Sequence, residues 1–277
     1  MAKPFLKWAG GKHYLADEIL KRLPQNINTY YEPTVGAGAI FFELAEQKRF
    51  KKACISDINS ELIKTYATIK NNVNGLIMLL QTIEYRHNKA KHPHDYYYKM
   101  RELDVSLLND VQTAARMIYL NRTGWHGLYR VNKSGGFNVP PGPDLHPTIL
   151  NEANLRAVSR VLKNVTITCQ DFEVTIKPAI NGDAVYIDPP YWPVKQGGFV
   201  SYTGSGFSST EQIRVAAVAQ KLKDKNVHVV LSNAAVPAVE KLYAGFEIDH
   251  VEVPRRISSN GAGRGKVGEV LIMSQRI

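Results

Sequence analysis

A strand, a glycine-containing turn and a helix follow one another directly near the N-terminus, and this unit most restricts the fold. Residues 29–32 have the pattern of a short strand, 33–38 form a loop with two glycines, and 39–47 have the apolar spacing of a helix. A second strand at 52–56 and a second helix at 59–71 repeat the arrangement. Since parallel strands need helical crossovers, the sequence predicts an α/β domain with a parallel sheet.

Further apolar runs supply the remaining strands of that sheet. They lie at 165–169, 184–187 and 227–231, and helical patterns at 149–162 and 210–223 accompany them. We expect these strands to be parallel and buried.

The alternation of strands and helices stops between residues 76 and 147, where the chain is rich in Tyr, Arg, Asn and Gly. This change predicts an inserted domain with helices near 96–105 and 110–120. Residues 129–139 contain a Ser-Gly-Gly centre, which is typical of a hairpin turn.

The charge points to a polyanionic partner. The 277 residues carry a net charge of +10, with 44% hydrophobic residues, so the chain is globular rather than disordered, collagen-like or a coiled coil. Lys and Arg gain free energy by displacing counterions from phosphates, which makes nucleic acid the leading partner class. A soluble protein that is merely basic explains the charge equally well, so the location of the charges must decide.

The cysteines and apolar runs favour a reduced, cytoplasmic protein without a membrane segment. Cys54 and Cys169 are far apart and lack metal-ligand spacing, and we expect both in buried strands. The longest aliphatic run, 76–80, is far too short to span a bilayer.

The glycine loop favours a nucleoside ligand over a dinucleotide. Phe41 occupies the position of the third glycine in a pyrophosphate-binding fingerprint. Glu32 before the loop and Asp57 after the second strand suit a nucleoside, because a carboxylate there can bind ribose hydroxyls. S-adenosylmethionine fits, as it has a nucleoside and no phosphate. A plain turn with a solvated aspartate is the alternative.

The segment 7–12 superficially resembles the end of a P-loop. The upstream glycine of that motif would fall at Leu6, and His13 replaces the magnesium-binding Ser or Thr, so NTP binding is rejected. The segment still places Trp8 and two lysines around a flexible turn, which suits a zwitterionic ligand. A disordered basic start is the alternative.

The sharpest chemical signal is Asp188-Pro189-Pro190-Tyr191, directly after an apolar strand. The two prolines set a rigid turn at the carboxyl edge of the sheet, where ligands of α/β proteins bind. A carboxylate, a backbone carbonyl and an aromatic ring together match a base with an exocyclic amino group: Asp188 and the Pro189 carbonyl accept its two hydrogens, and Tyr191 stacks on the ring.

With these motifs the chain resembles the DNA adenine-N6 methyltransferases of the Dam family, in the alpha group of the D12 class. The resemblance runs nearly from end to end. The matching blocks are 7–12, 32–38, 56–59, 121–140, 188–191, 231–233 and 255–260.

The resemblance implies a Rossmann-like, S-adenosylmethionine-dependent methyltransferase sheet with an inserted, mainly helical target-recognition domain that contains a β-hairpin. The implied division is 1–59 and 147–277 for the catalytic domain and 60–146 for the insert. The residues implied to surround S-adenosylmethionine are Trp8, Lys12, Glu32, Gly36, Gly38, Asp57, Asp171 and Phe172. The implied catalytic residues are Asp188, Pro189 and Tyr191.

The resemblance further implies direct methyl transfer to a flipped adenine within GATC in double-stranded DNA, by a monomer, with neither a metal nor a covalent enzyme intermediate. The residues implied to contact DNA are Lys7, Arg122, Trp125, His126, Leu128, Arg130 and Pro140. Among them Trp125 would intercalate, Arg122 would contact phosphate, and Lys7 would contact a guanine. Leu128, Arg130 and Pro140 would recognise bases. His126 stands where the family pattern has Asn at the unpaired base, and Thr34 replaces the usual Phe of the pocket.

The location of charge supports DNA as the partner. Residues 85–140 hold nine Lys and Arg against four Asp and Glu, and residues 254–268 hold four against none. A solvated basic face remains the alternative for Lys89 and Lys91.

The residues also bear on other activities. An N4-cytosine methyltransferase uses the same geometry, although Ser in place of Asp188 is more typical of it. A C5-cytosine enzyme is excluded because neither cysteine follows a proline. A DNA-binding module without catalytic activity is the alternative from another class.

Overall fold

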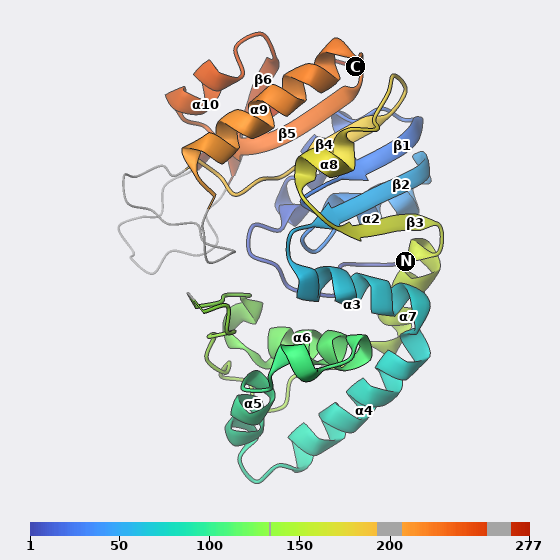
Figure 1. The fold of residues 1–277 in the computed structure, drawn as a ribbon, viewed down its shortest axis with the longest axis vertical. Coiled ribbons are helices and arrows are strands. Elements are labelled where there is room, and N and C mark those ends of the chain that lie inside the picture. The colour runs from blue at the N-terminus through green and yellow to red at the C-terminus, as the bar shows by residue number, and fades with distance from the viewer. Residues whose placement is uncertain (133, 193–206, 254–266) are drawn as a thin grey trace.

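The computed structural model describes residues 1–132, 134–192, 207–253 and 267–277. The predicted block 255–260 and most of the basic segment 254–268 therefore lie outside the described residues. Figure 1 shows a sheet flanked by helices, and a second, helical part formed by α4, α5 and α6.

Within the described residues, seven strands form one mixed sheet in the order β3-β2-β1-β4-β5-β7-β6. The first five strands of this order are parallel, and β7 runs antiparallel to both of its neighbours. The strands are β1 (Ile27–Glu32), β2 (Phe50–Asp57), β3 (Val165–Cys169), β4 (Ala184–Ile187), β5 (His228–Ala234), β6 (Glu247–Val253) and β7 (Val267–Met273). This confirms the predicted Rossmann-like α/β class and adds an antiparallel edge that the sequence analysis did not predict.

Polar side chains cap the helices and explain where several of them begin. Asn59 caps α3 and Asn151 caps α7, while Asn109 and Gln112 form a reciprocal capping box at α6. The α-helices are α1 (Ala16–Lys21), α2 (Ala39–Glu46), α3 (Ser60–Asn71), α4 (Val73–Lys89), α5 (Pro93–Arg101), α6 (Asp110–Thr123), α7 (Glu152–Leu162), α8 (Phe172–Ile176), α9 (Ser209–Asp224) and α10 (Pro237–Leu242). Short 3₁₀ turns occur at Lys12–Tyr14, Val105–Leu107 and Trp125–Gly127.

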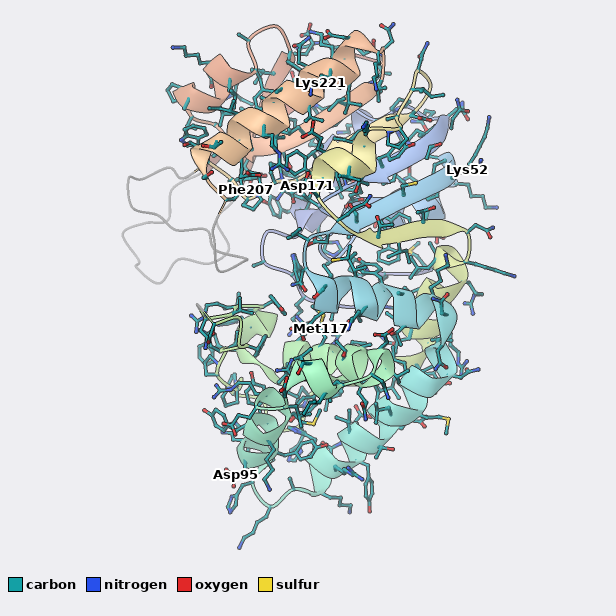
Figure 2. The ribbon with its side chains drawn as sticks, viewed as in Figure 1. Lys52, Asp95, Met117, Asp171, Phe207 and Lys221 are labelled. Atoms are coloured by element: carbon teal, nitrogen blue, oxygen red, sulfur yellow. The ribbon has the colours of Figure 1, made fainter. Side chains whose placement is uncertain are left out.

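The inserted helices share a hydrophobic core with one face of the sheet. Helix α3 contacts β2 and β3 on one side and α6 on the other. Figure 2 shows Met117 of α6 between these two helices, where its sulfur accepts a hydrogen bond from the Thr65 hydroxyl. The predicted domain boundary at residue 59 therefore falls just before α3, a helix that packs both on the sheet and on α6.

The predicted helix near 96–105 was placed too late in the chain. Helix α5 begins at Pro93, a favourable first residue, and ends at Arg101, and a separate 3₁₀ turn covers Val105–Leu107. The prediction that both cysteines are buried is also wrong for Cys169, which is exposed at the end of β3, whereas Cys54 is half-buried in β2.

The predicted hairpin is present as a tight reversal with a single bridge. Val131 pairs with Phe137, and the Asn132 amide donates to the Gly136 carbonyl at 2.8 Å. Gly135 has a φ of +83°, a left-handed conformation that favours glycine at this turn. Among the described residues, no helix is long and apolar enough to cross a membrane.

Candidate active site

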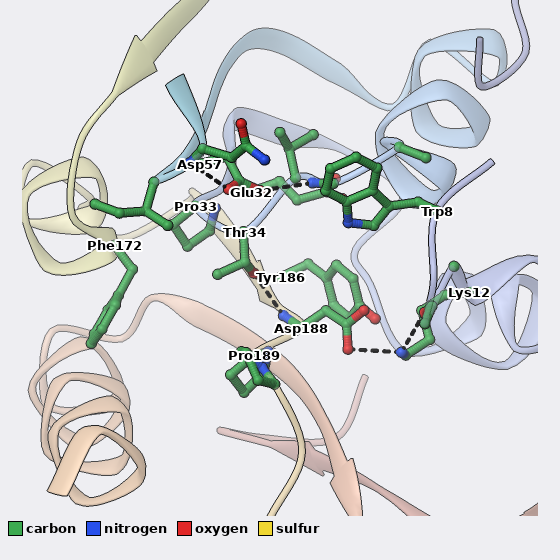
Figure 3. A pocket seen from close by; sticks show the side chains of 18 of the residues that line it. Trp8, Lys12, Glu32, Pro33, Thr34, Asp57, Phe172, Tyr186, Asp188 and Pro189 are labelled. Atoms are coloured by element: carbon green, nitrogen blue, oxygen red, sulfur yellow. Dashed lines mark hydrogen bonds and ion pairs between the residues drawn. The ribbon is translucent and has the colours of Figure 1, made fainter. Parts of the chain in front are cut away.

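A cavity of about 730 Å³ opens at the carboxyl ends of the parallel strands, the edge where α/β sheets bind ligands. All of the predicted cofactor and catalytic residues line it: Trp8, Lys12, Glu32, Gly36, Gly38, Asp57, Asp171, Phe172, Asp188, Pro189 and Tyr191. Figure 3 shows Trp8 and Phe172 on opposite sides of this space. The structure thus brings together residues from both ends of the sequence.

Asp188 follows β4 and is held from three directions. The Lys12 ammonium lies 2.9 Å from Oδ1, and the Ser232 hydroxyl donates to the same oxygen at 2.9 Å. The backbone amide of Asp188 donates to Thr34 Oγ1 at 3.0 Å, so Thr34 contributes a hydrogen bond in a position expected to hold an aromatic ring. Burial raises the pKa of Asp188, and the Lys12 charge opposes this rise.

Lys12 therefore lies against the carboxylate that is predicted to be catalytic. It is 4% exposed, and its ammonium also donates to the Gly10 carbonyl at 2.7 Å. The same ammonium lies 4.6 Å from the centroid of the Tyr191 ring. Its predicted contact with the cofactor remains a prediction.

The turn after Asp188 is fixed by a buried amide pair, Gln212 and Asn233, of which only Asn233 lies in a block singled out from the sequence. Gln212 of α9 donates to the Pro190 carbonyl at 2.6 Å, and Asn233 of β5 accepts from the Trp192 amide at 3.0 Å. Asn233 in turn donates to Gln212 at 3.0 Å. These bonds satisfy backbone groups beside the proline pair and make the turn rigid.

The glycine loop is shaped by close contacts. Gly36 has a φ of +49°, and a Cβ there would lie 2.8 Å from Cδ1 of the Trp8 indole. Its amide donates to Asp57 Oδ2 at 3.1 Å, and its carbonyl accepts from the Tyr66 hydroxyl at 3.0 Å. A Cβ on Gly38, at a φ of +72°, would lie 2.8 Å from that hydroxyl. This loop, the glycine cradle of the cavity, has no room for a Cβ at Gly36 or Gly38 unless Trp8 or Tyr66 moves.

Glu32 is buried at the floor of the cavity, where the Tyr30 hydroxyl donates to it at 2.6 Å. Burial raises the pKa of Glu32 to about 8; the Tyr30 hydrogen bond opposes the rise, and the Asp188 charge adds to it.

This shift predicts a stability that falls with pH. Between about pH 4.5 and 8 the folded protein holds a proton on Glu32 that the unfolded chain has lost, so the free energy of unfolding decreases as the pH rises. Glu32→Gln should remove this slope, and each unit of pKa shift corresponds to about 1.4 kcal/mol. Urea unfolding of the ligand-free protein at several pH values in this range measures the effect.

Glu46→Gln on α2 is the matched control, because it removes an exposed carboxylate from a neighbouring element. The stability of Glu32→Gln relative to wild type should grow with pH. If the free energies of unfolding of Glu32→Gln and wild type differ by the same amount at every pH, burial does not raise the pKa of Glu32.

Asp171 and Phe172 close the cavity at the start of α8. Asp171 caps the helix by accepting from the Glu173 amide at 2.9 Å, and it forms an ion pair with Arg214 of α9. The Arg214 guanidinium lies over the Phe172 ring, 4.3 Å from its centroid. The ring is therefore held between the cavity and α9.

The residues predicted to contact DNA gather around the junction between the N-terminal segment and the insert. Buried Asn121 accepts from the Lys7 amide at 2.8 Å and donates to the carbonyls of Lys7 and Gly127, at 2.7 and 2.8 Å. The Trp125 amide donates to the Pro140 carbonyl at 2.9 Å. The exposed members of the predicted set are Lys7, Trp125, His126, Leu128, Arg130 and Pro140.

Arg122 differs from these residues because it is half-buried. Its guanidinium donates to the Phe5 carbonyl at 2.9 Å, so it also holds the N-terminal segment. Burial lowers the pKa of Arg122. Contact with phosphate remains a prediction for this residue.

An aromatic stack joins the start of the hairpin segment to the cavity. Trp8 and Tyr129 stack with their centroids 5.5 Å apart, and the Tyr129 hydroxyl donates to Glu61 at 3.1 Å. Glu61 also pairs with buried Arg116 at 3.0 Å.

Glu269 of β7 is a site residue that the sequence analysis missed. It lines the cavity, is 7% exposed, and accepts hydrogen bonds from the hydroxyls of Tyr14 and Tyr191, each at 2.6 Å. The only available signal was a lone carboxylate in the apolar run 267–273. Of the residues that the structure describes, no group of three or more His, Cys, Asp or Glu is arranged to hold a metal ion.

The sheet and this cavity define the class of Rossmann-like methyltransferases. A family model described as D12 class N6 adenine-specific DNA methyltransferase matches residues 8–257, and the chain belongs to this family. It is therefore an adenine-specific DNA methyltransferase, and the alternatives of an N4-cytosine enzyme and a module without activity are set aside.

Curated relatives agree with the family. The chain is 39% identical to Type II methyltransferase M1.LlaDCHI of Lactococcus lactis subsp. cremoris, over 98% of this chain and 94% of the relative. It is 42% identical to Type II methyltransferase M.MjaIII of Methanocaldococcus jannaschii, over 98% and 99%. It is 35% identical to the DNA adenine methylase of Haemophilus influenzae, over 97% and 92%.

Proposed function

We propose that the protein transfers the methyl group of S-adenosylmethionine to N6 of an adenine that is flipped out of duplex DNA, within the sequence GATC. The observation that carries the proposal is the single cavity in which the glycine cradle and the Asp188-Pro189-Pro190-Tyr191 turn face the same space. The GATC assignment rests on the resemblance of the recognition residues.

The cradle fits S-adenosylmethionine. Gly36 and Gly38 line the cavity with backbone that carries no side chain, and Asp57, beside Gly36, can accept hydrogen bonds from ribose hydroxyls. Trp8 and Phe172 provide apolar walls on either side. When bound, S-adenosylmethionine would supply a methyl group activated by a positive sulfonium, which N6 would accept in one in-line displacement. S-adenosylhomocysteine would leave as the neutral thioether, and N6 would lose one proton, for which the Asp188 carboxylate is an acceptor within the same cavity.

The chain's own groups orient the nucleophile. The Asp188 carboxylate and the Pro189 carbonyl accept hydrogen bonds from the two N6–H groups. These bonds draw the nitrogen toward a tetrahedral geometry. The Lys12 ammonium, 2.9 Å from Asp188, favours the ionised carboxylate against the effect of burial. Holding the reactants in line lowers the activation free energy of methyl transfer. Extruding the base from the duplex costs about a few kcal/mol.

The inserted residues 60–146 would supply DNA recognition. Trp125 is 44% exposed beside His126, with the two rings 4.9 Å apart, which suits a side chain that fills the gap left by the flipped base. Direct contacts of Lys7, Leu128 and Arg130 with base edges would select the site.

The test is transfer of labelled methyl groups from S-adenosylmethionine to two duplexes of equal composition, one with GATC and one with the same bases scrambled. Digestion to nucleosides identifies the product. We expect N6-methyladenine in the GATC duplex alone. Label in cytosine, or equal labelling of the two duplexes, would refute the proposal.

Binding of S-adenosylmethionine should be sensitive to Gly36. In Gly36→Ala the new methyl group would strike the Trp8 indole at 2.8 Å, and the φ of +49° is strained for alanine. We expect the affinity measured by calorimetry to fall about tenfold or more, which corresponds to about 1.4 kcal/mol.

Gly135→Ala is the control for Gly36→Ala. It has a comparable left-handed backbone, with a φ of +83°, but its Cβ would meet nothing within 4 Å. This variant should bind S-adenosylmethionine as wild type does. If Gly36→Ala and Gly135→Ala bind S-adenosylmethionine with equal affinity, the glycine loop at 36–38 is not its binding site.

A further inference from the structure

Two tyrosine hydroxyls converge on one buried carboxylate beside the adenine site. The Tyr14 hydroxyl donates to Oε1 of Glu269, and the Tyr191 hydroxyl donates to Oε2, each at 2.6 Å. These residues come from the 3₁₀ turn Lys12–Tyr14, the turn after β4 and strand β7. A single glutamate thus joins three segments that lie far apart in the sequence.

The register of the sheet places Glu269 at the active edge. It pairs with Ala234, the last residue of β5, while β7 runs antiparallel. The start of β7 therefore lies beside the carboxyl end of β5, and Glu269 enters the cavity from there. The mixed sheet is what brings this carboxylate to the site.

The chemistry of the group suits two donors. A carboxylate accepts at both oxygens, whereas an amide in its place would offer one accepting oxygen and one donating nitrogen. Burial and the neighbouring carboxylates Asp188 and Glu269 raise the pKa of Tyr191, and burial together with Glu269 raises that of Tyr14. Both hydroxyls therefore remain protonated donors at neutral pH.

We propose that Glu269 is a positioning residue for methyl transfer, which fixes the Tyr191 ring against the flipped adenine and ties it to the segment that carries Lys12. The inference rests on the proposed function, because it assigns Tyr191 to the target base. The prolines hold the backbone of the turn, but they leave the side-chain torsions of Tyr191 free. The bond to Glu269 restricts those torsions, and Tyr14 holds the second oxygen of the carboxylate.

The Lys12 ammonium completes the arrangement. It is paired with Asp188 at 2.9 Å and lies over the Tyr191 ring, 4.6 Å from the ring centroid. Glu269 thereby links the ring that stacks on the base to the cation that orients the catalytic carboxylate. Loss of Glu269 should disturb the bound base more than the bound cofactor.

A double-mutant cycle tests the inference with Glu269→Gln, Tyr191→Phe and the combined variant. Tyr191→Phe keeps the ring and removes only the hydroxyl. Three quantities are measured: the single-turnover rate on a GATC duplex, the affinity for S-adenosylmethionine, and the fluorescence of 2-aminopurine at the target position. Tyr14→Phe is the comparison variant, because it removes only the hydrogen bond from the Tyr14 hydroxyl to Glu269 and leaves the bond from Tyr191.

We expect each member of the cycle to lower the single-turnover rate about tenfold or more and to change the 2-aminopurine signal, with S-adenosylmethionine affinity within about threefold of wild type. The combined variant should be no slower than the slower single variant by more than about twofold, because both changes break the same bond. Tyr14→Phe should be milder than Tyr191→Phe.

Other outcomes overturn the inference. Rate losses that multiply in the combined variant would show that Glu269 acts without Tyr191, and a loss of S-adenosylmethionine affinity at an unchanged rate would place Glu269 on the cofactor. If Glu269→Gln does not fold, a wild-type rate in Tyr191→Phe overturns it. If the wild-type protein neither transfers the methyl group nor changes the 2-aminopurine fluorescence, the proposed function is refuted instead.

Discussion

Replacing Asp188 with alanine is expected to lower methyl transfer about 10³-fold while DNA affinity stays within about threefold of wild type. The carboxylate lies at the cavity with a cation and a hydroxyl fixed on one oxygen, and the backbone amide is held by Thr34. It would orient the amino group of the base but contributes nothing to phosphate binding. Single-turnover kinetics and fluorescence anisotropy with a labelled duplex measure the two quantities separately.

Asp188→Asn is the informative control for this prediction. It keeps the size of the side chain and one accepting oxygen, but it cannot form an ion pair with Lys12. We expect a rate between those of the alanine variant and wild type. Turnover close to wild type in Asp188→Ala would contradict the proposed role of the carboxylate.

Much of the catalytic pocket could be predicted because its residues lie in local motifs. Gly36 and Gly38 occur in one loop between a strand and a helix, and Asp188 to Tyr191 directly follow an apolar strand. Parallel strands bring such loops to one edge of a sheet, so position along the chain already implies proximity. The cavity lining agrees with that expectation.

Glu269 and Gln212 could not be found in the same way. Glu269 reaches the site only because β7 is antiparallel and inserted between β5 and β6, and the apolar runs alone did not indicate that topology. Gln212 lies on the inner face of α9, where a polar residue in a helical pattern resembles any surface position. Their roles depend on tertiary packing rather than on local sequence.

The fold shows the same contrast. Five parallel strands were predicted from the sequence, but β6 and β7 were not, although residues 270–273 of β7 form an uninterrupted apolar run that is buried. Helix α4, Val73–Lys89, is one of the longest helices described, but the composition of residues 76–147 alone does not indicate it. Caps such as Asn72, which accepts from the Gly75 amide at 3.1 Å, were the missed local signal.

The choice of DNA sequence should depend on Arg130 and not on Arg122. Arg130 is exposed on the hairpin, where its Nε donates to Asn138 Oδ1 at 2.7 Å and its Nη2 donates to the Asn138 carbonyl at 3.2 Å. These bonds hold one edge of the guanidinium and leave Nη1 and the second hydrogen of Nη2 for a guanine. Removing such a contact costs about 1–3 kcal/mol and relaxes the preference at that base pair.

Methylation of random-sequence duplexes by wild type, Arg130→Ala and Arg122→Ala, mapped by long-read sequencing, measures the effect. Arg122 is half-buried and donates a hydrogen bond to the Phe5 carbonyl. Its loss should lower methylation at all sites alike, because it removes a phosphate contact or loosens the N-terminal segment. The pair therefore controls for loss of positive charge in the same region. An unchanged site preference in Arg130→Ala would refute base recognition by the hairpin, and a wild-type preference other than GATC would refute the specificity proposed from the resemblance.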